Sequence, residues 1–555
     1  MIKADIFRSV CQKVARRWAE CILALIIVSS ALLALFWVFT VPILQNPDEN
    51  SHIDYAFSIY SAGRLLNVRR APSEWNVHAR AGAHPGAAWE RISHQYTLYL
   101  ADATDFQRLR FHPEEKVSPD YGTAAYYERL DRNAPHSPAQ IPDLQPQDNP
   151  WLVTGYPFGY YALVAVWLGI LGRFTGSVVA LFFGARILSV VLLVGSLVLT
   201  YATTREIRFR KARALAITFI VAFFPLTTFV SSSIQPDNLS FLLVLLSIYL
   251  SLLIRKRPSH HWLLALLGMA LGILLVTKYH FYVFTFVSVL GAIAGEYIFK
   301  RRSRRAMLRG LSTLLLPSVI FFAVQLWVIW GESITARNLH HSTTPPTEGI
   351  KNAVADYYGG GAPFVSWWGI FGWMDTPLIG SMDIQRRITL LLLILTVVIL
   401  ALTLFRLEQV ITRLILLVRR RRWRWAVRIA FSNPLINSHF VFTIFMILLY
   451  ALTDNSFIAQ GRNWFPYILS SFLITTQYAP RALTHRRTQA WFSALMVLGL
   501  ALYCGIGSYY SIQTIKERYY GTHPTTIGLE FDGGRRMRNP VNCEARKNRI
   551  DLIRC

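Results

Sequence analysis

Residues 21–52 read CILALIIVSSALLALFWVFTVPILQNPDENSH, an apolar run that ends and is followed within five residues by two carboxylates. The apolar part, 21–44, is long enough to cross about 30 Å of hydrocarbon as a helix. It is too long for a signal-peptide core and lacks a small-residue cleavage site, so we expect a retained first span. Charge beside hydrocarbon is costly and usually functional. The stretch therefore predicts a membrane protein with a polar site at its surface.

Composition agrees with this class. The 555 residues are 53% hydrophobic and 14% aromatic, and only 16% are charged, against about 25% in soluble domains. The net charge of +26 lies in short basic runs between apolar segments, which predicts topology signals and no nucleic-acid partner. The five cysteines have no metal-ligand or redox spacing. The absence of a GxGxxG or Walker motif speaks against a nucleotide-driven pump.

The basic runs predict which loops face the cytoplasm, because short loops rich in Lys and Arg are retained there. They are the N-terminus and the segments 205–213, 255–261, 300–309, 406–434 and 481–487. We therefore expect an all-α polytopic membrane protein with the N-terminus inside and the C-terminus outside. Its eleven spans are 20–44, 178–204, 212–231, 238–254, 261–277, 280–299, 310–330, 388–405, 436–452, 464–480 and 489–510.

Two apolar segments are not counted as crossings. Residues 155–174, rich in Tyr and Trp, are placed in the outer interface as an amphipathic or re-entrant helix, with a twelfth span as the alternative. Residues 406–428 mix apolar side chains with arginines and are placed on the anionic cytoplasmic leaflet. The resulting regions are 1–44 (N-terminus and first span), 45–177 (long outer loop), 178–330 (spans 2–7), 331–387 (outer loop), 388–510 (spans 8–11, with the basic segment 406–434) and 511–555 (outer tail).

The motif NPDENSH predicts the start of a short helix. Asn46 is a good N-cap, Pro47 suits the first helical position, and Glu49 has the spacing of a capping box. On such a helix Asp48, His52 and Tyr55 share one face at spacings of four and three. Acidic residues in a first turn are also favoured by the helix dipole alone. The functional alternative is a general base, either Asp48 or Glu49, or a set of metal ligands.

Further charged residues are expected at the same outer face. Asp237 follows the third span in SSSIQPDN, and a simple helix cap would also explain it. Asp375 follows Trp373 in FGWMDT, where tryptophans could form an interfacial belt or stack on a sugar ring. Three cations would together bind a lipid-linked phosphate. Alternatively, each could extend its charged group from the hydrocarbon to the interface without any binding role. They are Arg186, Lys278 and Arg462.

These motifs resemble the GT-C superfamily of polyprenyl-phosphate-sugar glycosyltransferases. The resemblance rests on three features: an acidic pair after span one, an acidic residue between spans three and four, and a re-entrant helix before span two. Within that group, PDENSH, SSSIQPDN, TKYHFY, FGWMDTPL and AQGRNWFPY resemble a largely uncharacterised bacterial family of multi-spanning proteins over roughly residues 40–470. One departure is that Arg462 is followed by Asn463 and Trp464 where the family usually has Gly-Arg-Tyr.

The resemblance implies a GT-C-like fold and an inverting glycosyltransferase of the bacterial inner membrane. The donor would be a polyprenyl-phosphate-linked sugar, for example on undecaprenyl phosphate, and the acceptor a cell-envelope glycan or lipid-linked saccharide. Asp48 or Glu49 would be the base, with His52, Tyr55, Asp237, Trp373 and Asp375 in the substrate site. No cofactor is required, although a divalent cation shared by Asp48, His52 and Asp237 is an alternative. The rival functions are a lipid-linked glycan flippase and a polysaccharide polymerase or ligase.

Overall fold

The computed structural model describes residues 17–63, 65, 96–97, 99–109, 115–134, 157–257, 260–300, 303–329, 347, 351, 367–371, 376–378, 382–453, 461–521, 530–532 and 536–538. Regular structure in this part of the chain is almost entirely helical, which confirms the predicted all-α class. The strands form two short antiparallel pairs: β1 (Ile370–Phe371) with β2 (Thr376–Pro377), and β3 (Glu530–Asp532) with β4 (Arg536–Arg538).

Seven helices among the described residues are long and apolar enough to span a membrane. They are α2 (Trp18–Thr40), α9 (Val178–Glu206), α12 (Pro236–Lys256), α14 (Tyr279–Phe299), α15 (Arg304–Ile329), α19 (Met382–Arg419) and α23 (Arg486–Tyr520). An eighth candidate is the pair α20 (Trp423–Ala430) and α21 (Pro434–Thr453), which meet at a bend of 75°. The protein is therefore a multi-pass membrane protein.

The other three predicted spans are built from shorter helices. They are α10 (Lys211–Phe223) with α11 (Pro225–Val230), α13 (His261–Leu275), and the series η5 (Gly461–Tyr467), α22 (Ile468–Leu473), η6 (Ile474–Tyr478) and η7 (Ala479–Ala482). Phe224 is extended between α10 and α11, because the residue before a proline avoids the helical region. In the last series, Pro466 lies within the 3-10 helix η5 and Pro480 lies in the first turn of η7, where each removes a backbone N–H donor. Each of the eleven apolar runs thus coincides with helical structure.

The structure differs from the expected break at residue 406. Residues 406–419 continue α19 as one helix of 38 residues, which is about 57 Å long and well beyond the hydrocarbon thickness. Only the short α20 turns away. Residues 155–174 contain α8 (Gly159–Leu171), whose 13 residues reach only about 20 Å. Like α13, it is shorter than the helices that could each span a membrane alone, and the twelfth span stays an alternative.

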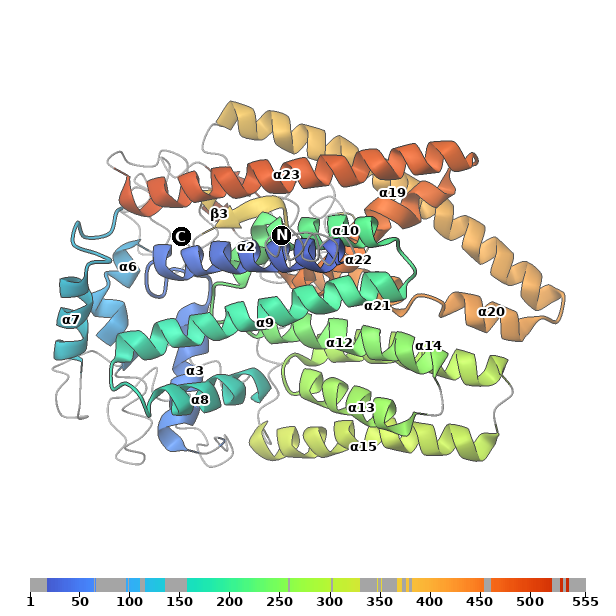
Figure 1. Cartoon of the computed structure of the whole chain (residues 1–555), viewed down its shortest axis with the longest axis horizontal. Coiled ribbons are helices and arrows are strands. Elements are labelled where there is room, and N and C mark those ends of the chain that lie inside the picture. Colours follow the sequence, from blue (N-terminus) through green and yellow to red (C-terminus); the bar gives the residue numbers. More distant parts are fainter. Residues whose placement is uncertain are drawn as a thin grey trace, which may run out of the picture.

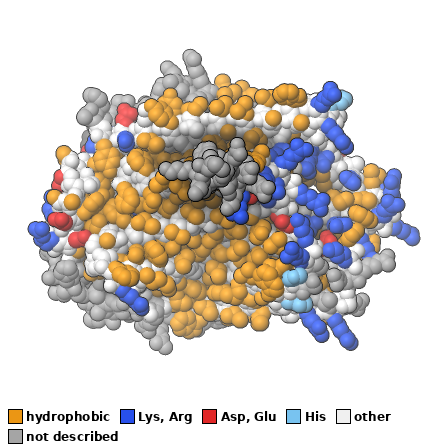
Figure 2. All heavy atoms as spheres, in the orientation of Figure 1, with side chains coloured by type: hydrophobic (Ala, Val, Ile, Leu, Met, Phe, Trp, Pro, Cys, Tyr) orange, Lys and Arg blue, Asp and Glu red, His pale blue; other side chains and the backbone are white. Residues whose placement is uncertain are grey.

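The long helices lie along the longest axis of the molecule, and the two ends differ in character (Figure 1). One end carries α3 (Glu49–Ala62), α6 (Phe106–Leu109) and α7 (Ala124–Asn133), and α3 runs across the ends of the long helices. Lys and Arg side chains gather at the opposite end, near α20, whereas apolar side chains dominate the middle (Figure 2). This separation is the one expected from the basic loops, with α3 at the end predicted to lie outside.

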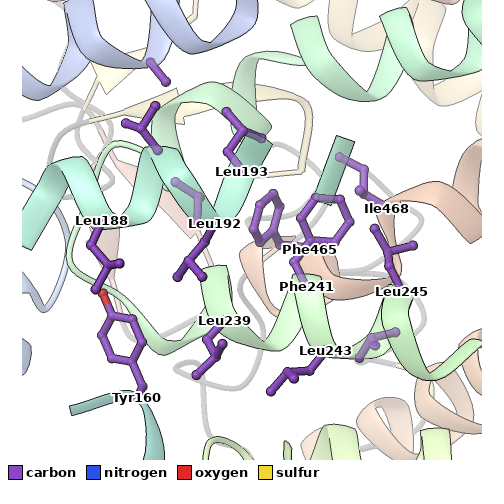
Figure 3. Close-up of a cluster of buried hydrophobic side chains, with 14 of the residues drawn as sticks. Tyr160, Leu188, Leu192, Leu193, Leu239, Phe241, Leu243, Leu245, Phe465 and Ile468 are labelled. Carbon is purple, nitrogen blue, oxygen red and sulfur yellow. The ribbon is translucent and has the colours of Figure 1, made fainter. Parts of the chain in front are cut away.

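The core lies where α9, α12 and the η5–α22 segment meet. Leu192 and Leu193 of α9 approach Phe241 of α12, which packs against Phe465 of η5 with ring centroids 4.8 Å apart (Figure 3). These side chains are buried. The core therefore joins helices from the middle third of the chain to a segment of the last third, and it supports the polar end carrying α3.

The last helix anchors the first loop at that end. The Val117 amide donates to the Tyr519 carbonyl over 3.1 Å, and the Lys116 ammonium donates to the Glu517 carbonyl over 2.8 Å. Arg518 is almost fully buried and donates from Nη2 to the Leu109 carbonyl over 2.7 Å. These bonds fix part of the first loop beside the candidate site.

Candidate functional site

The turn between α2 and α3 contains the acidic pair. Its residues 41–47 are buried, whereas Asp48 is partly exposed. Helix α3 begins at Glu49, with Asp48 as its N-cap at a φ of 59°, in the left-handed region. The predicted start, with Asn46 as N-cap, is therefore wrong by two residues. Left-handed backbone costs a non-glycine residue about 1–2 kcal/mol, although Asp tolerates it better than most.

Arg186 of α9 fixes this turn. Its Nε and Nη2 donate to the two carboxylate oxygens of Glu49 over 2.8 and 2.5 Å. Nη1 donates to the carbonyls of Val38 and Val41 over 2.8 and 2.6 Å, and Nη2 also donates to the Pro42 carbonyl over 2.8 Å. A guanidinium has five N–H donors, so every one has an acceptor within the protein. Both Arg186 and Glu49 have fully buried side chains.

This geometry corrects the expected roles of two residues. Arg186 has no donor left for a phosphate, so it positions the turn instead of binding substrate. Glu49 also accepts from the Ile234 amide over 3.2 Å and lies near the Asn46 amide, which leaves it poorly placed to act as a base. Of the two carboxylates, only Asp48 reaches partly exposed surface. Asp48 is therefore the more accessible of the two carboxylates.

The turn between α11 and α12 lies against the same residues. The Gln235 side chain donates to the Pro47 carbonyl over 2.8 Å, directly beside Asp48 in the chain. Asp237, in the first turn of α12, accepts from the Lys278 ammonium over 2.7 Å, and both side chains are largely buried. The helix cap is Gln235, so capping does not explain Asp237. The expected meeting of the acidic motifs at one end is present in the structure.

His52 and Tyr55 lie on one face of α3, as their spacing predicts, and that face packs against α8. The His52 Nδ1 lies 2.8 Å from the Tyr161 hydroxyl, and the Tyr55 and Tyr161 rings are 4.4 Å apart between centroids. Burial raises the pKa of the Tyr55 hydroxyl above its ordinary value, so the group stays protonated and can donate. Tyr161, which the sequence reasoning missed, orders this face.

Several buried oxygens around the two turns have no hydrogen-bond partner among the described residues. They belong to Asn50, Tyr55, Ser231, Gln235 and Asn238, and their side chains are at most 2% exposed. Buried polar groups in proteins are nearly always satisfied, so such a group of oxygens is chemically suited to a ligand or water molecules with many hydroxyl groups. Only the polar run SSSIQPDN in the sequence could have indicated this feature.

Three expected site residues are not placed. Trp373 and Asp375 lie outside the described residues. The backbone of Arg462 belongs to η5, which packs against α12 through the ring of Phe465, but its side chain is not described. Within the described part of the chain, no three His, Cys, Asp or Glu side chains form a group that could hold a metal ion. Asp48, His52 and Asp237 therefore do not assemble the expected cation site.

Taken together, the chain is a multi-spanning helical membrane protein with polar residues from distant segments joined at one end. A family model described as "Predicted membrane protein (DUF2142)" matches residues 31–471, and the chain belongs to this family. The resemblance to a multi-spanning membrane family over roughly residues 40–470 is thereby confirmed. No curated protein matches the chain.

Among solved structures, the chain is similar to the oligosaccharyltransferase of Archaeoglobus fulgidus, crystallised with a tethered acceptor peptide that contains the NVT sequon. The TM-score is 0.34 at 12% sequence identity, over 92% of this chain and 56% of that one. The chain thus spans little more than half the length of that protein. A likeness at this TM-score assigns neither substrate nor chemistry to this chain.

Proposed function

We propose that this protein is an inverting glycosyltransferase of the GT-C type. It would move a sugar from a polyprenyl-phosphate donor to a hydroxyl of a cell-envelope glycan or lipid-linked acceptor, at the extracytoplasmic face of the bacterial inner membrane. The observation that carries the proposal is Asp48, a partly exposed carboxylate on left-handed backbone between buried neighbours. Backbone strain of this kind persists where the surrounding structure enforces it, often at functional sites.

The surroundings of Asp48 support a base that must hold one position. The Glu49–Arg186 pair fixes the residue after it, and Gln235 fixes the carbonyl of the residue before it. A base needs to lie within hydrogen-bond reach of the proton that it removes. Rigid attachment on both sides serves that requirement, and the resemblance of PDENSH to the superfamily motif gives the same assignment.

In the proposed reaction, Asp48 accepts the proton of the acceptor hydroxyl. The hydroxyl oxygen attacks the anomeric carbon from the face opposite the phosphate, and the bond from that carbon to the phosphate oxygen breaks. Polyprenyl phosphate leaves with the bonding electrons, so the leaving group needs positive charge more than a proton. Lys278, oriented by Asp237, and Arg462 are the proposed cations.

The acceptor and the sugar are proposed to lie against the buried oxygens around the two turns. The Tyr55 hydroxyl and the Asn50 side-chain oxygen are suited to sugar hydroxyls. His52 is proposed to contribute by holding Tyr161 and α8 in place. Trp373 is proposed to stack on a sugar ring and Asp375 to contact its hydroxyls.

The test uses purified full-length protein and a labelled polyprenyl-phosphate sugar. Asp48→Asn should lower transfer about 100-fold or more, the usual contribution of a general base, while the protein stays folded because Asn also tolerates left-handed backbone. Asp102→Asn is the matched control, since Asp102 is an exposed carboxylate of the same loop. Transfer by Asp48→Asn at the rate of the Asp102→Asn control would refute the assignment.

The same assay separates the rival functions. A flippase would move the labelled lipid between leaflets of a vesicle without releasing polyprenyl phosphate. A polymerase or ligase would transfer a glycan of many sugars instead of one, which the product size reveals. Donor cleavage that depends on Asp48 and adds one sugar supports the proposal over both.

A further inference from the structure

Three arginines lie on segments that pack around α23 and η7, and none contributes to the proposed transfer. Arg213 lies in the first turn of α10, Arg406 in α19 and Arg481 in η7. Helix α19 packs against η7, and α10 and η7 both pack against α23. The charge of Arg481 acts on Arg213, and that of Arg406 acts on Arg481. Like charges repel, so this arrangement needs a compensating anion.

No carboxylate of the described residues pairs with any of the three arginines. Elsewhere in the structure the balance is different, since the buried Glu296 is shared by Arg255, Lys300 and Arg428. The three arginines of the cluster, by contrast, share no carboxylate among the described residues.

The cluster also contains donors that are ready for a ligand. Arg406 uses Nη1 to donate to Gln409 over 2.9 Å, and the Gln409 amide lies 3.5 Å from the Ala482 carbonyl, beside Arg481. The buried Arg406 Nε and the hydroxyl of Thr403, one turn earlier on α19, have no partner among the described residues. Thr403 is only 5% exposed. Two unsatisfied donors next to unbalanced positive charge are suited to a phosphate oxygen.

The helices that carry or pack against the cluster also expose apolar side chains. Leu404 and Phe405, adjacent to Arg406 on α19, are 56% and 53% exposed, and Trp491 near the start of α23 is 73% exposed. Exposed apolar side chains at the end of a membrane helix contact acyl chains, and Trp prefers the level of the headgroups. A ligand that covers both surfaces has a phosphate joined to hydrocarbon.

We propose that Arg213, Arg406 and Arg481 bind the phosphate of an anionic phospholipid. The site is separate from that of the proposed sugar donor, because its residues lie on α10, α19 and η7 and not on the turns beside α3. The phosphate offsets one of the three positive charges and joins α10, α19 and η7 at one point.

Binding of phosphatidylglycerol and phosphatidylcholine to the full-length protein in an uncharged detergent tests this site, by native mass spectrometry and by thermal melting. Arg406→Gln and Arg481→Gln should each weaken phosphatidylglycerol binding about tenfold, the factor expected for loss of a charge-assisted hydrogen bond. Arg413→Gln is the control, since Arg413 is an exposed cation of the same helix, and it should change binding less than about twofold.

Inorganic phosphate at the same concentration forms a separate arm. Little effect of phosphate, together with a strong effect of phosphatidylglycerol, supports a lipid ligand. Protection by inorganic phosphate as large as that by lipid would overturn the lipid assignment. Equal lipid binding by Arg406→Gln, Arg481→Gln and the Arg413→Gln control would overturn the site itself. Should Arg406→Gln fail to fold, the exposed Arg481 still provides the test.

Discussion

Replacing Arg186 by methionine should be among the most destabilising single changes in this chain. The substitution leaves the Glu49 carboxylate fully buried without its cation, and it removes the donors to the carbonyls of Val38, Val41 and Pro42. Breaking a buried ion pair by removing one partner costs about 3–5 kcal/mol. We expect a loss at the upper end of that range, because three carbonyls lose a charged donor as well.

A double-mutant cycle separates the ion pair from the rest. Glu49→Gln should cost less than Arg186→Met, since Arg186 would keep its three carbonyl acceptors. The double variant should be more stable than the sum of the single losses predicts, with a coupling of about 0.5–3 kcal/mol. Equilibrium unfolding in mixed micelles of increasing SDS fraction measures all three variants.

Lys211→Met is the matched control, because Lys211 pairs with Glu20 in an exposed ion pair and exposed pairs contribute little. An Arg186→Met variant that unfolds at the same SDS fraction as Lys211→Met would refute the stabilising role of the buried Glu49–Arg186 pair. Additive single losses, with no coupling, would show that Glu49 and Arg186 do not depend on each other.

Gly159→Ala should destabilise the protein by about 1–3 kcal/mol, because a Cβ at this position would lie 2.7 Å from the carbonyl oxygen of Val276. Gly176→Ala is the control, with no described atom within 4 Å of the added carbon, and its melting temperature should equal that of the wild type. Equal melting temperatures of the two variants would contradict the close contact of α8 with the end of α13. Arg518→Met should weaken the attachment of residues 115–117 to α23, because the Arg518 guanidinium donates to the Glu115 carbonyl. Hydrogen exchange of these amides should then rise, and unchanged protection would count against the anchor.

The spans could be predicted from the sequence because hydrocarbon imposes a length and a composition on each segment. The second predicted span, 178–204, differs from α9 by two residues at one end. The helix that contains the eighth predicted span extends beyond residue 405 to Arg419, because the apolar side chains among the arginines of 406–419 remain compatible with a helix. When a helix extends beyond the bilayer, its local composition does not show at which residue it leaves the hydrocarbon.

The site was predicted only in part, for a reason seen at Glu49. Its local spacing fits a capping box, yet its carboxylate binds Arg186, 137 residues away. Partners at that separation leave no local pattern. The sequence could therefore indicate that Asp48, Asp237 and Lys278 lie at one end of the molecule. It could not indicate which charged groups form buried ion pairs that hold the turn and so cannot bind substrate. The left-handed backbone at Asp48 is likewise a product of those distant contacts.

The contact between Lys116 and Glu517 joins positions 401 residues apart, which has a consequence for the order of assembly. A ribosome adds roughly 5–20 residues per second, so the first loop emerges roughly 20–80 s before the helix that holds it. During this interval the loop lacks its hydrogen bonds to α23. The proposed site can be completed only after α23 has been made, so a partly synthesised chain would lack it.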